Sequence, residues 1–352
     1  MKVNKKYVFS IIFFIVMLIL TIFILFKDND IEQIISIAKT VDIKYLGICL
    51  LLVIFYLLFE AFYILITFKS LKQKTTLSKC FAYSCVEYYF SAITPSSTGG
   101  QPFQSYYMAK DNIPVSKSTI VLLLNTLTFK LILLLLGIVC LVIKPSTILT
   151  NGLLFNILFI IGFIINLTVI ILCLLVMKSK RKVKKFVVFL INLLAKLHLK
   201  KNPEETIKKI DEYMDDFKKG VNYIKTHPIV TLKVLGLTLL QRVSMFSIGF
   251  VVYLAFGLTG YSFIEFLTIQ VAIAIAIDSL PFPGGMGITE VIMLNIYTGI
   301  YGESLLTAAV ILTRLFSYYF CLIFSGGISL INHLKTMIKN NSKEEIYNDR
   351  IL

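Results

Sequence analysis

Seven ionisable side chains lie inside or beside long apolar stretches of the chain, where a charge needs a partner. They are Glu60, Glu87, Lys130, Arg242, Asp278, Glu290 and Arg314. In the middle of a bilayer each would cost about 2.5–3.5 kcal/mol, so each is expected to face an opposite charge or water. The three cations suit a phosphate, and the acids suit either these cations or a substrate ammonium group. The alternative is a set of internal ion pairs that only holds helices together.

Two Gly/Pro-rich breaks interrupt the apolar stretches close to these charges. They read "ITPSSTGGQPFQ" at 93–104 and "LPFPGGMGITE" at 280–290. Unpaired backbone groups cost several kcal/mol each in hydrocarbon, so each break must be enclosed by protein or line a water-filled cavity. A helix that starts near Ile288 would direct free N–H groups into the membrane as an anion site. The first break offers a similar helix N-terminus, with the Thr98 hydroxyl and the Gln101 amide as additional polar groups.

The elements that position these residues are membrane helices. The 352 residues are 57% hydrophobic and their mean hydropathy is +0.84, which is typical of an integral membrane protein. Stretches of about 20 apolar residues can span a bilayer. The predicted spans are 7–26, 45–68, 118–143, 153–177, 228–256 and 304–331. The first is long for a signal-peptide core and lacks a cleavage site, so we interpret it as a retained span.

Loop charges predict that both chain ends are cytoplasmic. The segment 178–202 carries nine Lys and Arg and no acid, which places it on the inside. With this orientation, the regions around 79–117 and 263–301 must each enter and leave the membrane on one side, as re-entrant hairpins. The two halves then match in order but are reversed in direction. Spacing agrees, because Gly100 precedes Lys130 by 30 residues and Gly284 precedes Arg314 by 30.

The sequence therefore predicts an all-α polytopic membrane bundle with an inverted repeat that contains two re-entrant broken-helix hairpins. The alternative is two coincidental breaks in an eight-helix protein. The predicted divisions are an N-terminal span and outer loop (1–44), a first repeat (45–143), a linking span with a basic and amphipathic cytoplasmic segment (144–227), a second repeat (228–335) and a basic cytoplasmic tail (336–352). An amphipathic helix after Asn202 is expected to lie on the inner leaflet or to pack on the bundle.

Other classes of function have little support in the sequence. The net charge of +15 fits the positive-inside rule, and no RNA-binding motif accompanies it, so no nucleic-acid partner is expected. The six cysteines lack metal-type spacing and are interpreted as small core residues. The three histidines fall at predicted cytoplasmic edges, and no catalytic or nucleotide-binding motif is present. We therefore predict no metal, no cofactor and no catalytic residue.

The motif "LPFPGGMGITE" resembles the P-x-x-P-G-G-x-G-x-x-E signature of the lysylphosphatidylglycerol synthase transmembrane family, the flippase-like domain of the multiple peptide resistance factor. The earlier "ITPSSTGGQPFQ" is similar to the first motif of that family. The matching positions are Thr94, Pro95, Gly99, Gly100, Gln101 and Pro102, then Pro281, Pro283, Gly284, Gly285, Gly287 and Glu290. The resemblance covers about residues 5–335.

The resemblance implies a protein of the bacterial plasma membrane. Full-length members move lysyl- or alanyl-phosphatidylglycerol to the outer leaflet, which gives resistance to cationic antimicrobial peptides, and a separate soluble domain makes the lipid. Because the chain ends at Leu352, soon after the last predicted span, we expect no such domain here. The expected partners are membrane phospholipids, anionic or aminoacylated phosphatidylglycerol, and a separate lipid synthase is a candidate partner.

Three hypotheses follow for the function. The first is a lipid translocator in which a phosphate lies near the three cations and an ammonium group meets Glu87, Asp278 or Glu290. The second is a phosphatidylglycerol lysyltransferase, as the family name implies. The third is a carrier of another lipid-linked or polar solute.

Overall fold

The computed structural model describes residues 41–143, 152–178, 203–278 and 280–348, with positions 32, 36 and 39. This part of the chain is helical and contains no strand. The stretches long and apolar enough to cross a membrane are α3 (Ile43–Ser70), α6 (Val115–Ile143), α8 (Leu153–Lys178), α11 (Pro228–Ala255) and the region Pro283–Thr336. The predicted all-α polytopic membrane bundle is confirmed. The predicted span 7–26 lies outside the described residues.

The first break joins two shorter helices, α4 (Leu77–Ile93) and α5 (Gly100–Lys110). Thr94 leaves the helical conformation, and Pro95 begins the single turn η1 (Pro95–Ser97). Ser96 and Ser97 both have positive φ, a conformation that non-glycine residues rarely adopt. We call these residues, 94–99, the first turn.

The second break joins α12 (Phe263–Ile277) to α13 (Ile288–Arg314) through η2 (Pro283–Gly285). We call residues 280–287 the second turn. A capping box between Ser262 and Glu265 starts α12. At Gly302 the helix α13 folds back on itself, and the backbone there has φ 65° and ψ 172°. Only glycine adopts this conformation readily, so the reversal depends on the glycine. A π-helix, η3 (Leu315–Phe320), and α14 (Cys321–Asn348) complete the second half.

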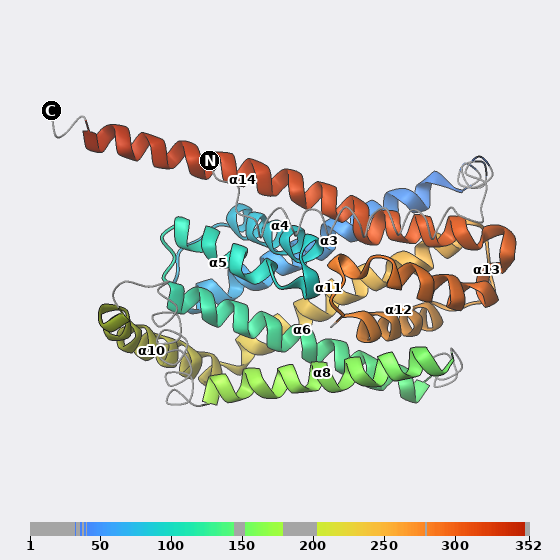
Figure 1. The fold of residues 1–352 in the computed structure, drawn as a ribbon, viewed down its shortest axis with the longest axis horizontal. Coiled ribbons are helices and arrows are strands. Elements are labelled where there is room, and N and C mark those ends of the chain that lie inside the picture. Colours follow the sequence, from blue (N-terminus) through green and yellow to red (C-terminus); the bar gives the residue numbers. More distant parts are fainter. Residues whose placement is uncertain are drawn as a thin grey trace.

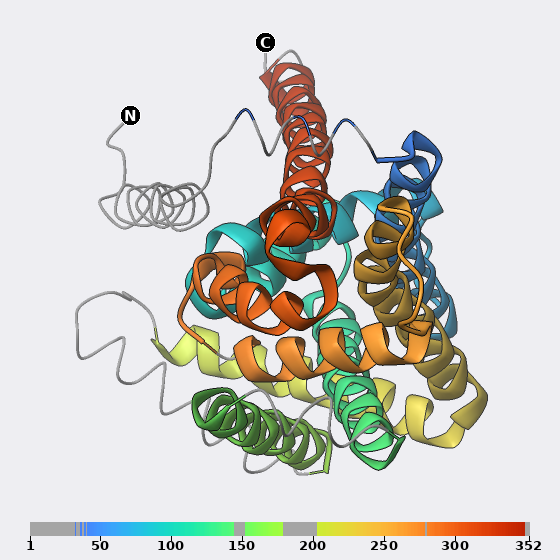
Figure 2. The same cartoon turned by 90° about the vertical axis from the view of Figure 1, so that its right-hand side faces the viewer.

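The two halves pack as counterparts. The hairpin of α4 and α5 occupies one end of the bundle and the hairpin of α12 and α13 the other, and the two turns meet between them (Figure 1). The packing is reciprocal, since α4 lies against α14 of the second half while α12 lies against α6 of the first. The long helices α3 and α11 pack together, and Figure 2 shows α12 beside α8. How the hairpins sit in a bilayer stays a prediction.

Helix α10 (Pro203–Thr226) packs on the bundle, which is one of the two expected arrangements. Phe217, Val221 and Ile224 are buried in one cluster with Leu71 and Ile120. All six cysteines are free and buried, as expected of core residues. By contrast, many Leu and Ile side chains of α8 are exposed, which suits a lipid-facing helix.

Candidate functional site

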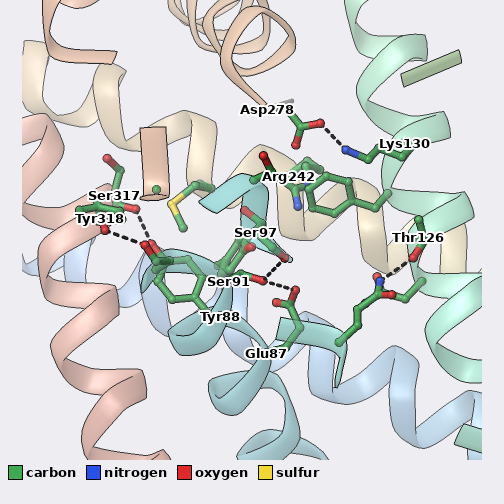
Figure 3. Close-up of a pocket in the computed structure, with 18 of the residues that line it drawn as sticks. Glu87, Tyr88, Ser91, Ser97, Thr126, Lys130, Arg242, Asp278, Ser317 and Tyr318 are labelled. Atoms are coloured by element: carbon green, nitrogen blue, oxygen red, sulfur yellow. Dashed lines mark hydrogen bonds and ion pairs between the residues drawn. The ribbon is translucent and has the colours of Figure 1, made fainter. Parts of the chain in front are cut away.

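A cavity of about 370 Å³ lies where the two turns meet. Its walls come from both turns, from the helices α3, α4, α5, α6, α11, α13 and η3, and from the end of α12, and they carry both signs of charge (Figure 3). The polar and charged residues that line it are Tyr56, Glu87, Tyr88, Ser91, Ser96, Ser97, Gln101, Asn125, Thr126, Lys130, Arg242, Asp278, Arg314, Ser317 and Tyr318. The cavity therefore collects charged groups from positions up to 227 residues apart, as Glu87 and Arg314 show.

Arg242 is the least satisfied charge in this cavity. It is 93% buried, and its Nε and Nη2 atoms have no hydrogen-bond partner. The guanidinium lies 3.2 Å from the centroid of the Phe129 ring and 5.8 Å from that of Tyr56, which fixes its position by cation–π contact. Since unpaired buried donors are costly, Arg242 is poised to bind an acceptor in the cavity.

Glu87 faces the same cavity from α4 and accepts a hydrogen bond from one neutral donor, the Ser91 hydroxyl. The Ser91 hydroxyl donates to Glu87 Oε1 at 2.9 Å and lies 3.4 Å from the carbonyl oxygen of Ser97. Gly100 makes this arrangement possible, because a Cβ there would lie 2.1 Å from Ser91 Oγ and 2.7 Å from the Glu87 carbonyl. In the view of Figure 3, Arg242 lies between the Glu87 and Ser91 side chains and the pair formed by Lys130 and Asp278.

Lys130 of α6 forms a salt bridge with Asp278 at the end of α12. Their side chains are 17% and 19% exposed, so the pair is largely enclosed. This contact joins the first half of the chain to the second. It also neutralises two of the charges that the sequence assigned to a substrate.

Arg314 is committed to the second turn. Its Nε donates to Glu290 Oε1 at 2.5 Å and its Nη2 donates to the Gly284 carbonyl at 3.2 Å. The other oxygen of Glu290 accepts from the Gly287 N–H at 2.8 Å. The start of α13, predicted as an anion site, therefore already holds a carboxylate of the chain itself. Arg314 still lines the cavity, whereas Glu290 is fully buried behind it.

Of the remaining residues that the sequence predicted for the site, some line the cavity and others do not. Gln101 lines the cavity and donates from Nε2 to Thr126 Oγ1 at 2.5 Å. Thr98, by contrast, is exposed and donates its hydroxyl to the Pro95 carbonyl at 2.9 Å, so it closes the first turn and does not line the cavity. Pro102 belongs to a separate groove along α14.

Two tyrosines that sequence reasoning missed connect the halves. Tyr318 donates to the Ala92 carbonyl at 3.0 Å, and Tyr88 donates to the Ser317 carbonyl at 3.1 Å. Both contacts depend on the π-helix η3, which turns Ser317 and Tyr318 toward α4. Only the run of aromatic residues after Arg314 hinted at them.

Among the residues that the structure describes, no group of three His, Cys, Asp or Glu could hold a metal ion. The described cavity lining contains neither His nor Cys. His333 lies instead against Tyr107, with 2.9 Å between Nδ1 and the hydroxyl, and His198 falls outside the described residues. The arrangement can bind an anion at Arg242 and a cation at Glu87.

Comparison with known proteins gives one family. No curated protein matched the chain. A model of the family described as the lysylphosphatidylglycerol synthase TM region matches residues 7–325. That range contains both turns and every charged residue of the cavity. The chain therefore belongs to the lysylphosphatidylglycerol synthase transmembrane family.

Proposed function

We propose that this multi-pass membrane protein is a lipid translocator of the bacterial plasma membrane. Its cargo would be a phospholipid such as lysyl- or another aminoacyl-phosphatidylglycerol, and both chain ends would be cytoplasmic. The family relates the chain to lysylphosphatidylglycerol in membranes. The observation that carries the proposal is the cavity where the two turns meet, with the Nε and Nη2 atoms of Arg242 left without a hydrogen-bond partner in its wall.

The charges of the cavity suggest how a headgroup would bind. Lys130 with Asp278 and Arg314 with Glu290 are neutral pairs, which leaves Arg242 and Glu87 for the ligand. A phosphate would accept hydrogen bonds from Arg242, and an aminoacyl ammonium group would donate to Glu87. The acyl chains would stay in the surrounding lipid. Outward movement of such a lipid would lower the negative surface charge and reduce attraction of cationic peptides.

The test is a leaflet-specific assay in proteoliposomes that contain lysyl-phosphatidylglycerol. An amine reagent that does not cross the bilayer measures the fraction of lipid in the outer leaflet over time. Loss of a hydrogen bond to a charged group costs about 1.5–3 kcal/mol, so Arg242→Gln should slow transfer roughly 10- to 100-fold. Lys233→Gln is the matched control, because Lys233 is exposed on the same helix. Equal transfer by wild type and Arg242→Gln would contradict the proposal.

The second candidate is a phosphatidylglycerol lysyltransferase, which the word synthase in the family description favours. It needs a surface for a charged tRNA, and the basic segment 178–202 that would serve lies outside the described residues except for Lys178. Purified protein given phosphatidylglycerol and lysyl-tRNA would then form lysyl-phosphatidylglycerol. Absence of that product would rule this candidate out.

A further inference from the structure

One acidic residue near the cavity is not used by the proposed lipid site. Glu60 of α3 is 99% buried and lies one helical turn from Tyr56, which lines the cavity. It forms no salt bridge in the described part of the chain. Its carboxylate accepts two neutral hydrogen bonds instead, from Gln104 Nε2 at 3.3 Å and from Gln241 Nε2 at 3.1 Å. A buried carboxylate held only by neutral groups is costly as a lasting charge.

The two glutamines have unused capacity that fits a second state of Glu60. Gln104 and Gln241 are at most 1% exposed, and the Oε1 atom of each is buried without a hydrogen-bond partner. An amide presents a donor on one side and an acceptor on the other. The nitrogen serves an ionised Glu60. After a turn of the amide, the oxygen would accept a hydrogen bond from a protonated Glu60.

We propose that Glu60, Gln104 and Gln241 form a proton-binding site that drives lipid movement, an inference that rests on the proposed translocation. The proton binds to a carboxylate oxygen of Glu60, whose charge changes from −1 to 0, and the new O–H donates to one amide oxygen. The amide that turns gives up its N–H hydrogen bond to Glu60, and no other covalent bond forms or breaks.

The site is coupled to the cavity through Arg242. The titratable groups that interact with Glu60 are Glu87 and Cys85 of α4, Arg242 of α11, Cys321 of α14, and Tyr56 and Tyr63 of its own helix. Arg242 is the single cation in this set, and it follows Gln241 directly in the sequence. With Glu60 ionised, two carboxylates lie near Arg242, and their negative charge weakens its attraction for a phosphate. With Glu60 protonated, Arg242 balances Glu87 alone, so a phosphate binds more readily.

Coupling of this kind is reciprocal: the proton favours the phosphate and the phosphate favours the proton. Each lipid that enters from one side would therefore take a proton with it. A difference in pH across the membrane would then move lipid against its own concentration gradient.

The experiment measures the steady-state ratio of lysyl-phosphatidylglycerol in the two leaflets of proteoliposomes, with the membrane potential clamped by potassium and valinomycin. One proton per lipid predicts a shift of about tenfold in this ratio for each unit of pH difference. Glu60→Gln should still equilibrate lipid, but its ratio should not respond to the pH difference. Glu303→Gln, exposed on α13, should respond like wild type. A wild-type ratio that ignores the pH difference overturns the inference.

Failure of the proposed function gives a different result, namely no transfer by wild type at equal pH. An infrared difference spectrum between acidic and alkaline buffer tests the proton site without transport. Wild type should show a carboxylic C=O band that is absent from Glu60→Gln protein of unchanged size-exclusion profile. A spectrum identical in both proteins also overturns the inference.

Discussion

The two turns of the molecule use the same backbone device with different side chains. In the first turn, Thr94 Oγ1 accepts from the Gly99 N–H at 2.8 Å. In the second turn, Glu290 Oε2 accepts from the Gly287 N–H, also at 2.8 Å. The first cap is a neutral hydroxyl, whereas the second is a carboxylate held by Arg314. The equivalent N–H groups of Gly99 and Gly287 therefore have acceptors of different strength, a hydroxyl in the first turn and a carboxylate in the second.

The surroundings of the two turns differ in the same sense. Ser96, Ser97 and Thr98 are exposed, while Gly285 and Met286 are buried. The second turn is therefore a fixed wall whose polar groups are satisfied within the protein. The first turn is more exposed, and its Ser96 and Ser97 border the same cavity as Glu87 and Arg242. We infer that the first turn and Glu87 border the ligand together with Arg242 of the second half, while the second turn supplies rigidity.

Glu290→Ala should give the largest effect, because it leaves the Arg314 guanidinium buried without its anion. Removal of one partner of a buried pair costs about 3–5 kcal/mol in the free energy of unfolding. The unfolding midpoint of the detergent-solubilised protein in a denaturant series measures the change. Glu303→Ala, at an exposed position of the same helix, should stay within about 0.5 kcal/mol of wild type. A loss below about 1 kcal/mol in Glu290→Ala would show that the second turn is not clamped.

Gly284→Ala should be the next most damaging change. Gly284 has φ +55°, and a Cβ there would lie 2.0 Å from the Tyr318 ring. The left-handed backbone costs an alanine about 1–2 kcal/mol, and overpacking adds about 1–3 kcal/mol. The same unfolding series measures the loss. Gly299→Ala is the control, since it meets nothing within 4 Å and should be neutral or stabilising by about 0.5–1 kcal/mol. Equal stability of both variants would remove the argument for close packing of Tyr318.

Much of this architecture follows from the sequence because apolar length and charge are local properties. The spans 45–68, 118–143, 153–177 and 228–256 lie within a few residues of the observed helices. Both breaks, and the charges beside them, are equally visible in the sequence. Gly284 and Arg314, which are 30 residues apart in the sequence, are in direct contact in the structure, where Arg314 Nη2 donates a hydrogen bond to the Gly284 carbonyl.

The choice of partners does not follow from the sequence, because it depends on how helices fold back. Glu290 and Arg314 meet only because Gly302 reverses α13 between them. Lys130 and Asp278 come from different halves. Thr98 looked like a ligand from its type alone, but its hydroxyl is used by its own turn. The sequence alone therefore could not predict which charged residues stay unpaired and able to bind a substrate.

Thr94→Val tests the weaker cap of the first turn. The substitution keeps the shape and removes the acceptor for the Gly99 N–H and the bond of 2.6 Å to the Phe90 carbonyl. Loss of such a cap costs about 1 kcal/mol, well below the value expected for Glu290→Ala. Differential scanning fluorimetry of both variants side by side gives the comparison. Similar losses in the two would mean that the turns are equally rigid.

Ser96→Ala should have the smallest effect on stability and tests whether the two turns can part. Ser96 Oγ donates to the Leu280 carbonyl at 3.4 Å, a long bond at an exposed position. Such a bond contributes little, so the variant should lie within about 0.5 kcal/mol of wild type. If the proposed translocation passes a headgroup between the turns, this contact must open, and transfer of lipid in proteoliposomes should then be unchanged or faster. A marked loss of stability would instead show that the contact between the turns is a strong one that stays closed. A lipid headgroup would then have to cross the protein by a different route.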